Sequence, residues 1–387
     1  MRVLHIGKFF PPHPGGIERS SADLTAALAV RGVGVAMLAH ADPGTSGSTQ
    51  VIDGVEVSRV RCHGQLVHAP LSPDFPFALR RAIRRFRPDL LHLHVPNTSA
   101  FWALLSPAAR RIPWVVHWHS DVPLDAAKTA LRVAYRVYRP WEQALLRRAA
   151  AVIATSQPYC DASVALNVWR EKVSIIPLGI DDPNRSVAKT TSWPADGLRI
   201  LAVGRLSYYK GFDVLLQALA QLPSAQLLLI GDGPCEAALR AQARELRIAD
   251  RVRFAGRVDD DELAAAYASA DGFCLPSTER SEAFGLVLLE AMRARLPTVA
   301  SAIPGSGVGF VVADGETGLL APPRDADALA RALAQLADPE LRTRLGAAGE
   351  RRWKSEFTLD RAADRTLALY RSVLEKTQRR AAAAQGT

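Results

Sequence analysis

Short runs of apolar residues alternate along the chain with longer segments in which apolar positions recur at helical spacing. Unbroken apolar strands that alternate with helices are typical of parallel sheets covered on both faces. The pattern therefore predicts an α/β protein. The runs that we expect to form strands are residues 2–7, 34–40, 90–95, 114–119, 151–156 and 173–178 in the first half and residues 199–204, 225–231, 251–256, 272–277 and 298–301 in the second.

Each half of the chain repeats this strand–helix pattern, which predicts two Rossmann-like domains. A polar, turn-rich stretch at residues 179–197 is the expected linker. We place the N-terminal domain at residues 1–183 and the C-terminal domain at residues 184–387, with a terminal helix at about 359–380 that is able to cross back to the first domain. Ligands of open parallel sheets bind beyond the carboxyl ends of the strands. Two such domains facing each other across a cleft would bring their motifs to one ligand.

Composition excludes several classes of protein. A chain of 387 residues with 48% hydrophobic and 22% charged residues is typical of a soluble protein with more than one core. No apolar run reaches the ~18 residues of a membrane-spanning helix, and the N-terminal segment has no secretory pattern. The four cysteines lack the spacing of a zinc site. We therefore expect a cytoplasmic protein with reduced thiols.

The basic charge is confined to the first half of the chain. Residues 1–180 contain 21 Lys and Arg against 12 Asp and Glu, whereas residues 181–387 contain 27 of each, so the first half carries the whole net charge of +9. A basic surface attracts the phosphate groups of nucleic acid, anionic lipid or a phosphorylated substrate. No nucleic-acid-binding motif is present, so nucleic acid is not an expected partner.

Two segments, residues 76–88 and 128–148, interleave arginines with apolar residues at helical spacing. A helix of this kind can lie on an anionic membrane, although the solvated outer face of a Rossmann helix gives the same pattern. The charge asymmetry favours the membrane surface. In the first segment the arginines concerned are Arg80, Arg81, Arg84 and Arg85.

Two loops after expected strands are candidate phosphate sites. The first, GRLSYYKG at residues 204–211, places Arg205 and Lys210 at a strand end, where a guanidinium and an ammonium can bind phosphate. An ordinary solvated basic loop is the alternative. The second, PPHPGGIERS at residues 11–20, brings Gly16 to a helix start, where backbone N–H groups can approach an anion. A plain glycine turn would look the same.

Histidine pairs follow two expected strands, His92 with His94 and His117 with His119. Residues two apart on a strand share a face, so each pair points to one side of the sheet. Four histidines with Asp121 could bind a metal. No further cluster with ligand spacing follows in the second half, so we expect no metal and one or two histidines that reach substrate hydroxyls.

Two glutamates bracket an apolar stretch in SEAFGLVLLEAM, residues 281–292. Glu282 is expected in a loop before a helix that begins near Gly285, and Glu290 within that helix. A carboxylate can accept hydrogen bonds from sugar or ribose hydroxyls, and free N–H groups at the helix start can bind hydroxyls or phosphate oxygens. The alternative is a buried salt bridge with Arg205 or Lys210.

Aspartates cluster at residues 257–271 and again at residues 323–333. They could form a metal–diphosphate motif, but both clusters open expected helices, where aspartate is favoured as a cap. Capping is the interpretation that we prefer, with a separate role for Asp260 considered below.

Together these motifs resemble the retaining glycosyltransferases of family 4, which have the GT-B fold. The resemblance covers nearly the whole chain. Its most specific part is the spacing of Glu282 and Glu290, preceded by the loop at residues 204–211 and by the segment IIPLGID at residues 175–181. The chain departs from the family pattern at AMRARLPTVAS, residues 291–301, where an Ala-Arg pair replaces a Cys-Gly turn.

The resemblance implies a role for each candidate residue. Arg205 and Lys210 would bind the donor diphosphate together with Gly16. His119 would lie next to the donor sugar and the reacting centre. No metal cofactor and no covalent nucleophile are implied. Glu290 would bind the ribose, and the backbone of Val258 would contact the base. The donor sugar would be bound by Glu282 with the backbone of Ala283, Phe284, Gly285 and Leu286.

The donor and acceptor are narrower predictions. Asp260 could accept from the N1–H and amine of guanine, a donor pair that uracil lacks, which favours GDP over UDP. Mannose follows from the resemblance. The basic half predicts a lipid-linked saccharide acceptor, and hence surface polysaccharide assembly at the cytoplasmic face of the inner membrane. The alternatives are a UDP-sugar-dependent glycosyltransferase, a sugar-nucleotide epimerase of similar fold and, more remotely, a metal hydrolase.

Overall fold

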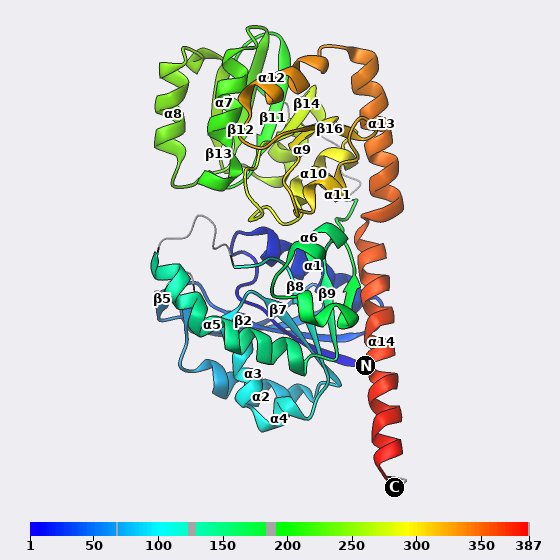
Figure 1. Cartoon of the computed structure of the whole chain (residues 1–387). Helices are drawn as coiled ribbons and strands as arrows, with labels where there is room; N and C mark the ends of the chain where they lie inside the picture. The colour runs from blue at the N-terminus through cyan, green and yellow to red at the C-terminus, as the bar shows by residue number, and fades with distance from the viewer. Residues whose placement is uncertain (67–68, 123–128, 183–190, 386–387) are drawn as a thin grey trace. The chain divides into compact units, whose positions relative to one another are not determined.

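The computed structural model describes residues 1–66, 69–122, 129–182 and 191–385. The chain divides into two compact units, Met1–Gly179 with Leu359–Thr387 and Ile180–Thr358 (Figure 1). The predicted domain boundary at residues 183 and 184 and much of the predicted linker lie outside the described residues. The terminal helix extends to Gln385, beyond the predicted end near residue 380, and it belongs to the first unit.

The first unit contains an eight-stranded sheet in the order β10-β9-β8-β7-β1-β2-β4-β3. Every neighbouring pair is parallel except β3 with β4. A separate two-stranded sheet pairs β5 with β6. The strands are β1 Arg2–Ile6, β2 Gly34–His40, β3 Ser48–Ile52, β4 Val55–Val60, β5 Gly64–Leu66, β6 Ala69–Leu71, β7 Leu90–Val95, β8 Trp114–Trp118, β9 Ala151–Ala154 and β10 Val173–Ile175.

Helices cover this sheet on both faces. Helix α1 lies beside the terminal helix α14 (Figure 1), and their apolar side chains, among them Leu28 and Tyr370, pack on the strands with Val3 and Met37. Helix α2 packs on β1 and β2. The helices of this unit are α1 Gly16–Val30, α2 Phe75–Phe86, α3 Trp102–Leu105, α4 Pro107–Arg110, α5 Thr129–Arg148, α6 Gln157–Ala162 and α14 Leu359–Gln385, with 3-10 turns η1 Thr98–Phe101 and η2 Asn167–Lys172.

The second unit has a six-stranded, fully parallel sheet in the order β13-β12-β11-β14-β15-β16. Its strands are β11 Leu198–Val203, β12 Ala225–Ile230, β13 Val252–Gly256, β14 Gly272–Leu275, β15 Thr298–Ser301 and β16 Gly318–Ala321. Its helices are α7 Phe212–Ala220, α8 Glu236–Glu245, α9 Asp260–Ser269, α10 Leu286–Arg293, α11 Val308–Val311, α12 Ala326–Gln335 and α13 Pro339–Glu356, with 3-10 turns η3 Tyr208–Lys210 and η4 Ala249–Arg251.

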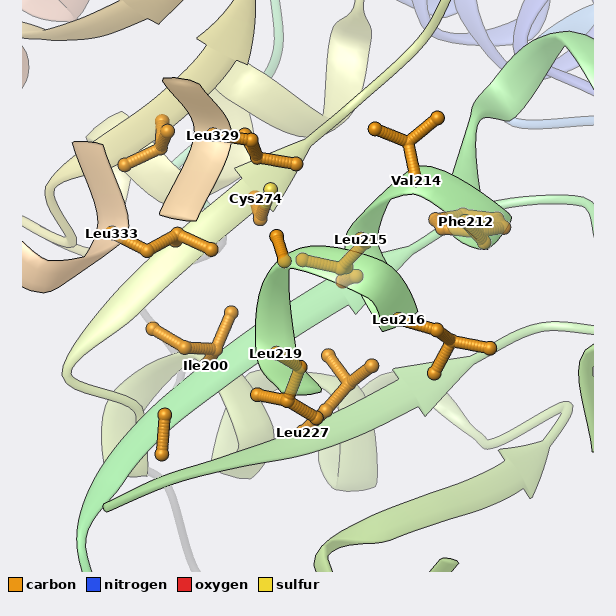
Figure 2. Packing of buried hydrophobic residues seen from close by; sticks show 14 of the residues in the cluster. Ile200, Phe212, Val214, Leu215, Leu216, Leu219, Leu227, Cys274, Leu329 and Leu333 are labelled. Atoms are coloured by element: carbon orange, nitrogen blue, oxygen red, sulfur yellow. The ribbon is translucent and has the colours of Figure 1, made fainter. Parts of the chain in front are cut away.

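The core of the second unit joins α7 and α12 to the sheet. Leu215 and Leu219 of α7 belong to one cluster of buried side chains with Ile200 of β11 and Leu333 of α12 (Figure 2). These side chains are fully buried, and burying each one contributes about 1.5–3 kcal/mol. Packing of this kind fixes the strand ends from which the candidate site residues project.

All eleven predicted strands are present, so the α/β prediction is confirmed. The unpredicted strands in the first unit are β3 to β6. Of these, β3 is mostly exposed at the sheet edge and β4 is only partly buried, so neither forms an unbroken apolar run. In the second unit β16, with only four residues, was also not predicted. Among the described helices, none combines the length and apolar character needed to cross a bilayer.

Candidate active site

A buried ion pair lies at the centre of the candidate site in the second unit. Lys210 Nζ is 2.6 Å from Glu282 Oε2, and Ser277 Oγ donates to the same oxygen at 2.8 Å. Burial by itself lowers the pKa of the Lys210 ammonium, but the neighbouring Glu282 carboxylate outweighs burial and the pKa is raised. Sequence analysis preferred a ligand-facing Glu282 to a salt bridge. The structure shows the salt bridge with Lys210.

A glycine permits the approach of these two loops. Gly211 follows Lys210 with a φ of 67°, a conformation that few other residues adopt. A Cβ on Gly211 would lie 2.1 Å from the carbonyl oxygen of Pro276, which precedes Ser277. The turn after β11 and the loop after β14 can therefore come close only with glycine at this position. Arg205, in the same loop as Lys210, is exposed.

Helix α10 begins at Leu286, as predicted, with Gly285 as its N-cap. Gly285 has a φ of 83°, and a Cβ there would lie 2.8 Å from Leu288 Cδ1. The backbone before the helix is fixed from outside, because Ala283 O accepts from Gly307 N at 2.9 Å and Ser306 Oγ donates to Glu282 O. First-turn N–H groups have no partner within a helix. This helix start is therefore held in place from outside the helix, and the binding of oxygen atoms there remains a prediction.

Glu290 is half-buried on α10 and accepts a hydrogen bond from Tyr267 of α9 at 2.8 Å. Burial, and next the Glu290 carboxylate, raise the pKa of the Tyr267 hydroxyl, so tyrosine remains the donor. Sequence reasoning missed Tyr267. The sequence marks it only as a tyrosine in an otherwise apolar stretch, and the hydroxyl of a buried tyrosine usually has a hydrogen-bond partner.

The aspartates at the start of α9 act mainly as caps. Asp259 Oδ1 accepts from Glu262 N at 2.8 Å, and Glu262 Oε2 accepts in return from Asp259 N at 3.2 Å. Asp325 caps α12 with a single bond, in which its Oδ1 accepts from Ala328 N at 2.8 Å. The preference for capping is confirmed at both helix starts. Val258 is half-buried in the loop after β13, and Asp260 is exposed in the first turn of α9.

In the first unit, Gly16 is exposed at the start of α1. Glu18 lies close to the preceding residue, since a Cβ built on Gly15 would lie 2.0 Å from Glu18 Oε2. Burial raises the pKa of the Glu18 carboxyl. A carboxyl group therefore already lies near the helix start at which an anion was expected.

Five histidines form a cluster on one face of the first sheet. His5 of β1 pairs in register with His92 of β7, and His94 pairs with His117 of β8. His119 follows β8 directly. All five are buried, and burial lowers the pKa of each ring, to about 3 for His5 and His117. The rings are therefore neutral. Sequence reasoning missed His5, although the first strand placed it on the face of the other histidines.

The histidine nitrogens are close enough to suggest a metal, but the rings are poorly oriented for one. Nitrogens of His94, His117 and His119 lie within 4.8 Å of one another. The rings of His117 and His119 stack with centroids 4.1 Å apart and planes 10° apart. A metal about 2.1 Å from both nitrogens would lie well out of at least one ring plane. The arrangement suits hydrogen bonding better, and the expected absence of a metal remains a prediction.

Most of the cluster nitrogens bond one another. Among the described residues, His117 Nε2 and His119 Nδ1 have no partner. A cavity of about 10 Å³ lies beside His94, His117 and His119 and is also lined by Ser20 and Ser21. These two nitrogens are therefore the candidates for the predicted contact between a histidine and a substrate hydroxyl.

A larger cavity of about 500 Å³ lies elsewhere in the first unit. Its lining is mostly apolar and includes Leu71, Phe101 and the partly exposed Trp102, Leu105 and Trp141. Sequence reasoning did not find it, because its residues come from separate segments that are brought together only by the fold.

Comparison with known proteins assigns the family. Residues 15–179 match the family model described as "Glycosyl transferase 4-like domain", and residues 186–352 match "Glycosyl transferases group 1". The chain is 30% identical to O-antigen chain mannosyltransferase C of Escherichia coli over 97% of this chain and 99% of that protein. It is 34% identical to the phosphatidyl-myo-inositol mannosyltransferase of Mycobacterium leprae, over 90% and 91% respectively.

Among solved structures, sucrose-phosphate synthase from Thermosynechococcus elongatus superposes with a TM-score of 0.77 at 27% identity, covering 97% of this chain and 100% of that one. This likeness, with a parallel sheet in each unit, confirms the predicted GT-B fold. The chain therefore belongs to the group 1 glycosyltransferases, with a glycosyltransferase 4-like N-terminal domain.

Proposed function

We propose that this glycosyltransferase moves mannose from GDP-mannose to a lipid-linked saccharide, with retention of configuration. The observation that carries the proposal is the buried Lys210–Glu282 pair beside the start of α10. A buried ion pair contributes little net stability, because desolvation offsets its attraction. A pair kept beside free helix N–H groups is instead suited to exchange its partners for a charged ligand.

In this proposal Lys210 and Glu282 bind different groups of the donor when it enters the site. Lys210, with the exposed Arg205, binds the diphosphate, and Glu282 accepts hydrogen bonds from the sugar hydroxyls together with the backbone of residues 283–286. Glu290, already oriented by Tyr267, holds the ribose hydroxyls. Cations and a helix start stabilise the departing diphosphate, so the reaction as proposed needs no metal.

The mannose donor is supported by the names of the two relatives above, both mannosyltransferases. For the base, we propose that the Val258 backbone contacts guanine and that Asp260 accepts from its N1–H and amine. Because Asp260 is exposed next to a capping aspartate, a UDP-sugar is the alternative donor.

A lipid-linked acceptor is supported by the first unit. Its apolar cavity of about 500 Å³ is large enough for part of an isoprenoid or acyl chain. The outer face of α2 exposes Arg80, Arg81 and Arg84, which can meet anionic headgroups, while Arg85 pairs with Glu56. We therefore propose action at the cytoplasmic face of the inner membrane in surface polysaccharide assembly. An epimerase would have no use for such a cavity.

A panel of nucleotide sugars tests the proposal. The purified protein is incubated with each donor, with and without short-chain lipid-linked saccharides, and release of the nucleoside diphosphate is measured. We expect release from GDP-mannose that rises with the acceptor and is lost in Glu282→Gln, a variant that keeps the size of the side chain. Release from a UDP-sugar alone would show that the donor is a UDP-sugar rather than GDP-mannose. Release from none of the panel would refute the proposal.

A further inference from the structure

The buried histidines and one tyrosine form a single hydrogen-bonded chain. From one end, His117 Nδ1 lies 3.2 Å from His92 Nε2, and His92 Nδ1 bonds the hydroxyl of Tyr370 on α14. The tyrosine hydroxyl lies 3.5 Å from His5 Nε2. The chain continues from His5 Nδ1 to His94 Nε2 at 3.1 Å and from His94 Nδ1 to His119 Nε2 at 2.9 Å. The chain therefore runs from His117 through Tyr370 to His119.

Only two proton arrangements satisfy every link. A neutral imidazole has one N–H and one bare nitrogen, and a hydroxyl donates once while it accepts. Each link needs one donor and one acceptor, so the direction of one bond fixes all the others. Either all five rings carry the proton on Nδ1, or all five carry it on Nε2. In the first arrangement His119 presents an N–H at its unpartnered Nδ1, and in the second it presents a bare nitrogen.

Ser21 distinguishes the two arrangements. Its hydroxyl lies 2.6 Å from the carbonyl oxygen of Ile17 and 3.3 Å from His94 Nδ1. A carbonyl oxygen can only accept, so the single hydroxyl hydrogen of Ser21 goes to Ile17 O, which leaves only oxygen lone pairs towards His94. His94 Nδ1 must then carry a proton, because a bare nitrogen would face those lone pairs.

We infer that Ser21 and Tyr370 are positioning residues that hold His119 as a hydrogen-bond donor at Nδ1. This inference rests on the proposed function for its catalytic meaning, because sugar transfer supplies the substrate oxygen to which His119 would donate. Ser21 and Tyr370 themselves contact other rings of the chain, His94 and His92. They act through the chain of rings, and Tyr370 does so from the C-terminal helix, far from His119 in the sequence. A substrate oxygen that accepts hydrogen bonds is the ligand that this site selects.

The first test is spectroscopic and needs no substrate. With histidines labelled by ¹⁵N, long-range ¹H–¹⁵N correlation spectra show which ring nitrogen is protonated. We expect Nδ1–H in all five cluster histidines of the wild-type protein and a mixture of both tautomers, including at His119, in Ser21→Ala. Ser20→Ala is the matched control, because Ser20 is buried on the same helix and also donates to Ile17 O, at 3.1 Å. Among the described residues, Ser20 makes no hydrogen bond to a histidine.

Wild-type spectra with Nε2–H at His119, or identical spectra for Ser21→Ala and Ser20→Ala, would overturn the inference. The second test is kinetic. Ser21→Ala and Tyr370→Phe should lower kcat several-fold with little change in the KM for the donor. Thr25→Val, which removes another buried hydroxyl of α1 that donates to Ala22 O at 2.8 Å and does not line the cavity, should match the wild type. Equal kinetics in all variants would overturn the link to catalysis. A protein with Nδ1–H tautomers but no transferase activity would refute the proposed function and leave the proton chain intact.

Discussion

The buried histidine cluster predicts an unusual loss of stability in mild acid. In the folded chain burial keeps the five rings neutral, with pKa values of about 3 for His5 and His117 and well below the usual value for the other three. In the unfolded chain each histidine takes up a proton near pH 6.5. Below that pH the unfolded state binds more protons, so the free energy of unfolding falls as the pH falls.

The magnitude follows from the proton count. Between pH 7.5 and pH 5.5 each buried histidine lowers the free energy of unfolding by about 1.4 kcal/mol, which is about 7 kcal/mol for five. Domains are usually stable by only about 5–15 kcal/mol. The first unit should therefore approach unfolding near pH 5.5, and the loss should continue until the pH nears the folded-state values of about 3.

Hydrogen exchange of the β7 and β8 amides in this unit, measured at pH 7.5, 6.5 and 5.5 and corrected for the intrinsic rates, gives the free energy of opening at each pH. In His92→Phe the pH-dependent loss should be smaller by about 1.4 kcal/mol, whatever the variant does to stability at pH 7.5. Val116→Ala, at a buried position of β8 that does not titrate, should leave the loss unchanged. A wild-type loss below about 2 kcal/mol would refute the conclusion that these rings are buried and neutral.

Three further predictions concern the ligands. Glu290→Ala should weaken nucleotide binding by about 10- to 100-fold in calorimetry, since charge-assisted hydrogen bonds contribute about 1.5–3 kcal/mol. Glu282→Gln should mainly lower turnover. Normal donor binding and turnover in both variants would count against the site. Asp260→Asn should narrow the gap between GDP and UDP affinities, and tighter UDP binding by the wild type would end the guanine proposal. Flotation with anionic liposomes should show binding that weakens with salt and is lost when Arg80, Arg81, Arg84 and Arg85 become Glu. The control Arg331→Glu with Arg351→Glu, in the second unit, should leave liposome binding unchanged. Equal binding to neutral liposomes would contradict membrane attachment through headgroups.

Much of the fold was predictable because burial on two faces leaves a direct mark on the sequence. Unbroken apolar runs located the central strands, and Gly285 located the start of α10, where a positive φ favours glycine. Edge strands such as β3 leave no such mark, because their exposed side chains can be polar.

The candidate site was predictable only in part. Motif spacing brought out Lys210 and Glu282, but their direct bond was only the less favoured alternative, because that contact depends on the approach of two loops at Gly211. The histidine pairs were visible, but their chain was not. Tyr370 lies 278 positions from His92 in the sequence, and no local pattern links a residue on the terminal helix to a strand of the first sheet.

The central claim is that the second unit binds a nucleotide sugar whose sugar is transferred with retention. Proton NMR of the protein with GDP-mannose and a lipid-linked saccharide follows the anomeric signals of donor and product in one experiment. The donor signal should decay only with active protein, and the first product should have the anomeric configuration of the donor. An intact donor in the presence of acceptor, or a product of inverted configuration, would contradict this claim.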